Sequence, residues 1–419
     1  MNRLLTLILL LCSIALYGED THTRIFSPSF HSLQIRNEIN DQLPPVLVLG
    51  SNDILSVSFD EFAETHRDLR YTLHHLDADW NIDRLVADEY IDTFNDAPVE
   101  NYDYSNTTTA HYVHYTIPIP DGRMAPLVSG NYLIRVYEDG EPDETLLQAR
   151  FYVTEEAVDV NGSVSGITDI DYRDAHQQLS IQVDGKDDFT LDDLSNRLIV
   201  KVLQNGRQDN IVTLTHPQFL TGQSARYEHQ KQLIFPAGNE YRRFETVSTI
   251  YPGRGVEEIR YAHPYYHMKL ATDLQRNRSG YAYDRTQNGR YRIREYNSDN
   301  SDLDADYVVV HFELEAPYYP DADIYIDGDL TNRRFDSESR MHYDSSSGVY
   351  RHTMMLKQGS YNYQYVVLPH GATEALTLPI EGDFYETDND YTILVYYRRP
   401  GARYDRLLAV RTLYGARGR

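Results

Sequence analysis

The segment 162–166, Gly-Ser-Val-Ser-Gly, holds serine and glycine in an order close to the nucleophile elbow of hydrolases. That elbow places a serine at the centre of a sharp turn between a strand and a helix. Here Val164 occupies the central position, and no helical pattern follows it. We therefore expect no serine nucleophile in this segment.

The acidic residues Asp302, Asp304 and Asp306, followed by Glu313, match several ligand positions of a calcium-binding EF-hand loop. The sixth position of such a loop requires glycine, because the backbone turns sharply there. This chain has Tyr307 at that position, and the residues after it alternate as a strand. Solvated loop carboxylates explain the acidic cluster better than a calcium site.

The adjacent His74 and His75, followed by Asp77, Asp79 and Trp80, suggest metal ligands. Neighbouring side chains of a strand point to opposite faces, so the two histidines cannot bind one ion without a bulge. We interpret them as structural, and we expect no metal, no cofactor and no catalytic residue. A carboxylate pair for glycoside hydrolysis stays open, because its separation of ~5–10 Å is a tertiary property.

The N-terminus has the pattern of a secretory signal peptide, in which a basic residue precedes an apolar run. The run extends from Leu4 to Leu11, and small residues lead to Gly18. We predict a signal peptide over residues 1–18. The only cysteine, Cys12, lacks the small preceding residues of a lipoprotein signal, so cleavage would leave a mature chain without thiols or disulfides.

The composition excludes several classes of partner. The 64 acidic residues outnumber 39 basic residues, and the net charge of −25 argues against nucleic acid or anionic lipid as the main partner. No later segment approaches the ~18 apolar residues of a membrane helix, so we expect no direct membrane insertion. The 36 tyrosines favour strands and supply amphipathic contact area at interfaces.

Short alternating segments separated by turn residues predict an all-β fold of tandem immunoglobulin-like β-sandwich domains. The clearest predicted strands are 46–49, 55–59, 70–76, 112–119, 132–137, 148–153, 179–183, 198–202, 307–314, 323–326, 348–356, 360–367 and 391–397. We expect no helix longer than a turn or two. The chain is also too long for one core, because single cores stop growing near 250–300 residues.

Three domains are expected from the changes in composition along the chain. An N-terminal β-sandwich domain would span 26–155, and a middle β-rich domain would span 157–300. The polar stretch 275–304 at the end of the middle domain predicts a long loop. A C-terminal early-set immunoglobulin-like domain, ending in a basic tail, would span 305–419.

Five segments, which follow one another in order along nearly the whole mature chain, jointly carry a family resemblance. They are 73–80 (Leu-His-His-Leu-Asp-Ala-Asp-Trp), 129–132 (Ser-Gly-Asn-Tyr), 238–244 (Gly-Asn-Glu-Tyr-Arg-Arg-Phe), 382–391 (Gly-Asp-Phe-Tyr-Glu-Thr-Asp-Asn-Asp-Tyr) and 403–407 (Arg-Tyr-Asp-Arg-Leu). Together they resemble the type IX secretion system plug protein family. Where that family commonly has His-Cys before Asp-x-Asp-Trp, this chain has His75-Leu76, which we interpret as a packing substitution.

This resemblance implies a periplasmic protein, associated with the outer membrane through the type IX translocon. Such a protein binds the outer-membrane β-barrel translocon and occludes its pore when no substrate is passing. The resemblance further implies a monomer within a hetero-complex, with no enzymatic activity.

A second, narrower resemblance covers residues 307–367, which are similar to glycogen-binding, early-set immunoglobulin-like modules. Those modules place a sugar-stacking tryptophan just after the position of Asn332. Here Arg333, Arg334 and Phe335 follow. We therefore expect the fold without the carbohydrate function. The alternative function is a periplasmic or surface carbohydrate-binding protein.

The C-terminal stretch is basic within an acidic chain. From residue 398 onward, Asp405 is the single acidic residue among the arginines Arg398, Arg399, Arg403, Arg406, Arg411, Arg417 and Arg419. Oppositely charged patches raise association rates, and arginine and tyrosine often anchor interfaces. We therefore predict partner binding by Arg398, Arg399, Arg403, Tyr404, Arg406 and Arg411. The alternative is that these arginines pair with carboxylates of the same chain.

Overall fold

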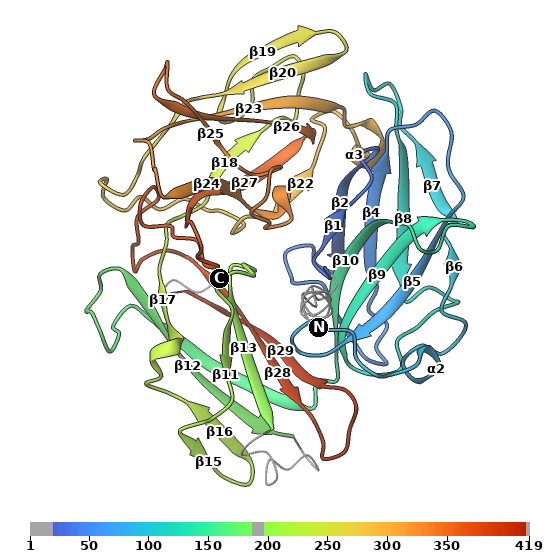
Figure 1. The fold of residues 1–419 in the computed structure, drawn as a ribbon, viewed down its shortest axis with the longest axis vertical. Helices are drawn as coiled ribbons and strands as arrows, with labels where there is room; N and C mark the ends of the chain where they lie inside the picture. Colours follow the sequence, from blue (N-terminus) through green and yellow to red (C-terminus); the bar gives the residue numbers. More distant parts are fainter. Residues whose placement is uncertain (1–19, 187–196, 416–419) are drawn as a thin grey trace, which may run out of the picture.

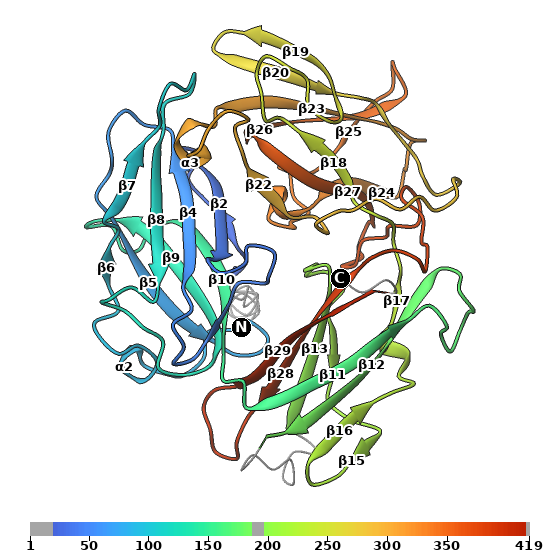
Figure 2. The ribbon, with the colours of Figure 1, turned by 180° about the vertical axis from the view of Figure 1, so that it is seen from behind.

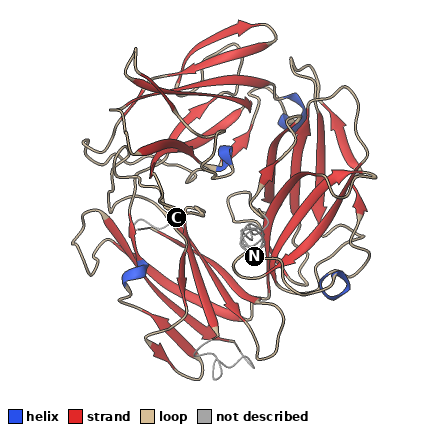
Figure 3. Ribbon diagram, viewed as in Figure 1, coloured by secondary structure: helices blue, strands red, loops and turns tan. Residues whose placement is uncertain are grey.

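The computed structural model describes residues 20–186 and 197–415, so the predicted signal peptide 1–18, with Cys12, lies outside the described residues. Within the described ranges the chain folds almost entirely into strands that form three β-sandwiches (Figures 1 and 3). The α-helices within these ranges, α2 (Ala87–Tyr90) and α3 (Ser301–Asp304), have four residues each. The predicted all-β fold of tandem sandwiches is confirmed.

The first sandwich occupies residues 20–155 and has two sheets. One sheet has the order β1 (Arg24–Ile25), β10 (Thr145–Thr154), β9 (Gly130–Glu138), β5 (Leu69–Leu76) and β6 (Ala97–Pro98), with β3 (Val46–Val48) also paired to β10. The other has the order β2 (Phe30–Asn37), β4 (Leu55–Glu61), β8 (Val113–Ile119) and β7 (Asn101–Tyr104). Inward-facing side chains of both sheets, including Phe59, Tyr132 and Phe151, form its core.

The second sandwich combines two stretches that are distant in the sequence. One sheet has the order β11 (Val158–Ser165), β12 (His176–Gly185), β16 (Ser224–Tyr227) and β15 (Phe219–Leu220), with β17 (Ile234–Pro236) on β12 and η1 (Lys231–Leu233) before it. The other has the order β14 (Val212–Leu214), β13 (Leu198–Gln204), β28 (Asp390–Tyr397) and β29 (Arg406–Tyr414). The last strands of the chain therefore complete this sandwich.

The third sandwich lies between β17 and β28 in the sequence. One sheet joins β18 (Arg242–Glu245), β27 (Gly359–Pro369) and β22 (Tyr291–Ile293), with β24 (Ala322–Asp327) on β27 and η2 (Asp329–Thr331) after β24. The other has the order β19 (Val256–Ala262), β20 (Tyr265–Leu270), β23 (Tyr307–Glu315), β26 (Val349–Lys357) and β25 (His342–Asp344), with β21 (Asp273–Leu274) on β23. This sandwich is inserted into the second one (Figure 2).

The strand pairing differs from the boundaries expected from the sequence, 157–300 and 305–419. Strands β13 and β28 pair antiparallel from Leu198 opposite Tyr397 to Gln204 opposite Tyr391. The final strands thus belong to the sandwich that begins at residue 157, and β18 to β21 belong to the inserted one. Alternation in the sequence locates a strand but does not say which distant strand it joins.

Each strand named from the sequence coincides with an observed strand, but others were missed. The predicted basic tail contains β29, which carries apolar side chains at Leu407, Leu408 and Ala409 into buried positions. The predicted loop 275–304 contains β22 and α3. Strands β2, β19 and β20 were also absent from the prediction.

Strand β28 is buried along its whole length because its two faces enter two different apolar clusters. Ile393 and Val395 pack into the core of the second sandwich. Leu394 and Tyr396 lie on the opposite face and join Leu76 of the first sandwich in a separate cluster. This second cluster holds the first two sandwiches together.

Each sandwich packs on the other two, so that the three surround a common centre (Figure 1). The first and third meet at a small cluster of Ala110, Tyr112 and Tyr307. The second and third meet where Arg207 donates a hydrogen bond to the Ala375 carbonyl at 2.7 Å. Several of the many tyrosines are buried at these contacts, where the ring packs and the hydroxyl donates a hydrogen bond.

Candidate functional site: the junctions between the sandwiches

The segment 73–80 lies at the junction of the first and second sandwiches, and His75 is buried there. Its Nε2 donates to the Ser129 carbonyl at 3.1 Å, and its Nδ1 contacts the Asp83 carboxylate. The ring meets the ring of Tyr404 edge-on at 5.5 Å. His74 instead contacts the Thr72 hydroxyl, so the two histidines have separate partners. The separate partners agree with the opposite faces that strand alternation predicts for adjacent residues.

Asp405 joins this segment to the C-terminal strands. The backbone N–H of Ala78 donates to its Oδ2 at 3.0 Å. Arg398 donates to both oxygens of the same carboxylate at 2.7 Å. Nearby, the Tyr396 hydroxyl donates to the Asn131 side chain at 2.7 Å. The family-like segments around residues 78, 131 and 405 therefore form one contact between two sandwiches.

The backbone at Gly130 lies directly against the His75 ring, which explains why glycine follows Ser129. A Cβ added to Gly130 would lie 2.3 Å from the His75 ring, so only glycine fits. The Ser129 hydroxyl donates to the Glu155 carboxylate at 2.6 Å and accepts the Leu407 N–H at 3.1 Å. Arg406 also binds Glu155. Burial alone raises the pKa of Glu155, but Arg406 and Ser129 outweigh burial and lower it.

The segments 238–244 and 382–391 run side by side where the chain enters and leaves the third sandwich. The Gly238 N–H donates to Asp383 at 2.9 Å, and the Asn239 amide donates to the Glu381 carbonyl at 2.8 Å. The Asp388 N–H donates to Glu240 at 3.1 Å. These contacts join the two segments that connect the second and third sandwiches and so fix the position of the inserted sandwich.

A buried carboxylate, Glu381, forms the centre of this second junction. Arg242 contacts both of its oxygens at 2.9 and 3.0 Å, and Arg276 contacts one at 2.7 Å. Burial favours the neutral acid, but the charges of Arg242 and Arg276 outweigh burial and lower the pKa of Glu381 to about 2. The carboxylate therefore stays ionised at neutral pH.

The structure places the predicted docking arginines close to the first junction, and three of them bind carboxylates of the same chain. Arg398 binds Asp405, Arg403 binds Glu89, and Arg406 binds Glu155. The remaining predicted residues are Tyr404, which packs on His75, and Arg399 and Arg411, which are exposed and have no ion pair within the described ranges. Arg417 and Arg419 lie outside the described residues.

The acidic cluster 302–306 also serves a junction. Both carboxylate oxygens of Asp306 accept backbone N–H groups of the first sandwich, from Thr109 at 2.9 Å and Ala110 at 3.1 Å. In the parts of the chain that the structure describes, no group of three His, Cys, Asp or Glu side chains could hold a metal ion. Nor is any helix there long and apolar enough to cross a membrane.

The position after Asn332 offers no exposed aromatic platform. The side chain of Arg333 is 7% exposed and donates to Asp329 at 2.8 Å. Phe335 packs against the ring of Tyr325, with 5.4 Å between the ring centroids. Both side chains are therefore engaged by other residues of the third sandwich.

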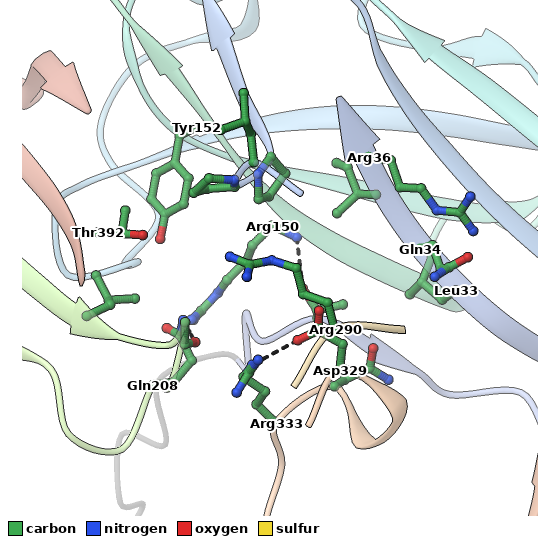
Figure 4. Close-up of a pocket in the computed structure, with 18 of the residues that line it drawn as sticks. Leu33, Gln34, Arg36, Arg150, Tyr152, Gln208, Arg290, Asp329, Arg333 and Thr392 are labelled. Carbon is green, nitrogen blue, oxygen red and sulfur yellow. Dashed lines mark hydrogen bonds and ion pairs between the residues drawn. The ribbon is translucent and has the colours of Figure 1, made fainter. Parts of the chain in front are cut away.

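A pocket of about 230 Å³ lies where all three sandwiches meet (Figure 4). The first sandwich contributes Arg36 and Arg150, the second contributes Leu203, and the third contributes Arg290. Sequence reasoning missed this pocket, because its walls are separated by more than 250 residues in the chain. Two other cavities, lined by residues between 258 and 353 and between 71 and 123, lie within the third and the first sandwich respectively.

A family model described as the type 9 secretion system plug protein 1st domain matches residues 30–155. The chain belongs to the type IX secretion system plug family. The matched range is the first sandwich and includes the segments around His75 and Gly130. Membership gives the protein a role in type IX secretion and a place in the secretion machinery of the cell envelope, and it points away from catalysis.

A solved structure of a hypothetical protein from Parabacteroides merdae ATCC 43184 is similar over nearly the whole length. It is 38% identical, covers 94% of this chain and 99% of its own, and superposes with a TM-score of 0.92. The plug-family chain thus shares its three-sandwich arrangement, including the insertion, with that protein.

Two other structures give only low scores. The DNA glycosylase AlkC of Pseudomonas fluorescens, bound to DNA, is 14% identical over 30% of each chain, with a TM-score of 0.17. The Salmonella α-2-macroglobulin reacted with methylamine is 11% identical over 95% of this chain and 24% of its own, with a TM-score of 0.16. Neither likeness supports an inference about fold or function. A comparison with curated proteins found no match.

Proposed function

We propose that the chain is a periplasmic plug that binds the outer-membrane β-barrel translocon of the type IX secretion system and occludes its pore. The observation that carries this proposal is the match of the first sandwich, residues 30–155, to the plug family. The junctions add support, because polar contacts and apolar clusters fasten each sandwich to the other two. A stopper has to be a rigid body, since a chain of loosely linked domains would leave gaps in a pore.

The proposed partner is the translocon barrel, which the protein would join as a monomer within a hetero-complex. We propose that Arg399 and Arg411 contribute to docking, because both are exposed and have no ion pair in the described ranges. Arg398, Arg403 and Arg406 are less available, since each binds a carboxylate of this chain. Exposed arginines in an acidic chain suit an acidic surface on the partner.

Capture from detergent-solubilised outer membranes tests the partner. The wild-type protein should recover a very large barrel protein, and recovery of none would contradict the proposal. The pair Arg399→Glu and Arg411→Glu should weaken capture, more strongly at low salt, without changing the melt of the free protein. The matched control, Arg173→Glu with Arg260→Glu, changes the net charge equally at two exposed positions and should capture normally.

Occlusion is tested separately by permeability. A deletion strain should admit more of a large hydrophilic solute through its outer membrane than the parent strain, provided that translocon levels are equal. Unchanged permeability would argue against occlusion even if the capture experiment succeeds.

The rival function, carbohydrate binding, has no specific support in the third sandwich. Arg333 is buried and Phe335 packs on Tyr325, so neither offers a stacking face. Titration of the whole chain with α-glucans should therefore give no saturable heat. Saturable binding in the micromolar range would favour the rival.

A further inference from the structure

The pocket at the centre of the three sandwiches has mainly apolar walls. The apolar and aromatic side chains are Leu33, Ile35, Leu43, Pro44, Pro45, Trp80, Tyr152, Leu203 and Tyr291. Polar and charged side chains, including the carboxylates Asp41 and Asp329, line the rest of the wall. Its volume of about 230 Å³ is below the roughly 300–1,000 Å³ of pockets that enclose drug-sized ligands. The pocket therefore fits a small apolar group or the end of a longer molecule.

Four arginines line this apolar pocket, and they divide into two pairs (Figure 4). Arg290 and Arg333 are neutralised by carboxylates, Asp390 at 2.8 Å and Asp329 at 2.8 Å. Arg36 and Arg150 differ, because within the described ranges neither has an ion pair. Neither guanidinium of this second pair therefore has a carboxylate of the described residues within ion-pair distance, although Asp41 also lines the pocket and the charge of Asp20 acts on Arg150.

Arg150 is held in place without a carboxylate. Its Nε donates to the Thr21 carbonyl and its Nη2 to the Thr21 hydroxyl, both at 2.7 Å. The guanidinium lies 4.3 Å from the centre of the Trp80 ring, which is a cation–π distance. Burial lowers the pKa of Arg150 to about 10. In Arg290 burial acts in the same direction, but Asp390 outweighs it and raises the pKa.

Charge and shape together indicate the ligand. An uncompensated arginine in an apolar site binds carboxylates strongly, because its planar group donates two parallel hydrogen bonds. Apolar walls favour a ligand whose remaining part is hydrocarbon. We propose that this pocket binds an apolar molecule bearing one carboxylate, which Arg36 and Arg150 hold by its charge. The carboxylate belongs either to the C-terminus of an apolar peptide or to a small organic acid.

Binding at this place ties the three sandwiches together, because the walls come from all of them. Trp80 and Arg150 belong to the first, Leu203 to the second, and Tyr291 to the third. A ligand that binds only the assembled protein stabilises it by mass action. The melting temperature should therefore rise with ligand concentration, and the rise should fall with added salt.

Trp80 provides the assay, because it is the only tryptophan of the chain and lines the pocket. Its fluorescence is titrated with three probes: acetylated trileucine with a free carboxylate, the same peptide as its C-terminal amide, and octanoate. Saturable change with the acid peptide or with octanoate supports the proposal, and the tighter of the two identifies the source of the carboxylate. Equal binding of the acid and the amide, or no saturable change with any probe at millimolar concentration, overturns it.

Variants locate the binding charge. Arg36→Gln should weaken binding of the acid probe about tenfold, as expected for one lost charge-assisted hydrogen bond, and should leave the melt of the free protein unchanged. Arg150→Lys keeps the charge and should retain part of the affinity. The matched control, Arg260→Gln, removes an exposed arginine outside the pocket and should bind as the wild type does. Wild-type affinity in Arg36→Gln and Arg150→Lys alike would overturn the assignment of the site.

Discussion

Removing the charge of Lys357 should destabilise the contact between the first and third sandwiches. This lysine on β26 and Asp60 on β4 form an ion pair with 2.6 Å between Nζ and Oδ2, and their side chains are 2% and 1% exposed. Nζ also donates to the Asp302 carbonyl at 2.6 Å and lies 4.1 Å from the Tyr112 ring centre. Lys357→Met keeps the length of the side chain and leaves a buried carboxylate without its cation.

Breaking a buried ion pair by removing one partner costs about 3–5 kcal/mol. Asp60 keeps two other donors, the Tyr307 hydroxyl and the His114 ring, each at 2.6 Å. We therefore expect a loss near the lower limit, about 3 kcal/mol. Adding Asp60→Asn removes the unpaired charge, so the double variant should recover most of this loss and lie within about 1 kcal/mol of the wild type.

The loss should depend on pH in a defined direction. Burial raises the pKa of Asp60, but Lys357 and His114 outweigh burial and lower it. A depressed native pKa contributes stability that is complete above the unfolded value of about 3.9 and is lost as the pH falls through the native value. Lys357→Met removes the largest influence that lowers the pKa of Asp60, so Asp60 in this variant takes up a proton at a higher pH than in the wild type. The stability difference from wild type should therefore shrink between pH 7 and pH 5.

Urea unfolding followed by far-UV circular dichroism at both pH values measures these differences. Because three sandwiches need not unfold in one step, the midpoint of the first transition is compared. Lys269→Met, which removes an exposed lysine paired with Glu257, is the matched control and should leave the midpoint unchanged. A double variant no more stable than Lys357→Met, or a loss equal at pH 7 and pH 5, would refute the reasoning.

Two further substitutions and a pair of fragments probe the remaining junctions. Arg406→Ala should lower the melting temperature by a few degrees, because it leaves the half-buried carboxylate of Glu155 without its cation. Arg411→Ala removes an exposed arginine and should leave the melting temperature unchanged. Equal melting temperatures of the two variants in calorimetry would contradict this difference. A fragment of residues 305–419 should show no cooperative melt, because it contains β28 and β29 without their partner strand β13. A fragment of residues 240–383 contains both sheets of the third sandwich and should melt cooperatively. Glu381→Gln should destabilise the protein at pH 7. Chemical denaturation at decreasing pH should show that the stability difference from wild type shrinks toward pH 2, because the native carboxyl of Glu381, with a pKa of about 2, becomes protonated there.

Local pattern was sufficient for much of the fold. The alternation of segment 307–314 identified β23, because a half-buried strand needs apolar side chains at every second position. The short apolar and aromatic run 391–397 identified β28, which is buried on both faces. Strand β29 was not predicted, because its arginines were interpreted as part of a basic tail. The adjacent apolar residues Leu407, Leu408 and Ala409 indicate a buried strand. The opposite faces expected for His74 and His75 followed from the same period of two.

Membership of the plug family and the all-β class were determined by the sequence itself, because both depend on residue types in local order. Tertiary structure alone decided that β28 pairs with β13, since almost 200 residues separate them and nothing local specifies a partner at that distance. It also decided that Arg403 binds Glu89 and Arg406 binds Glu155, since side chains distant in sequence become neighbours only after folding. The central pocket has the same origin, because each of its walls is a surface that the sandwiches form only by packing together.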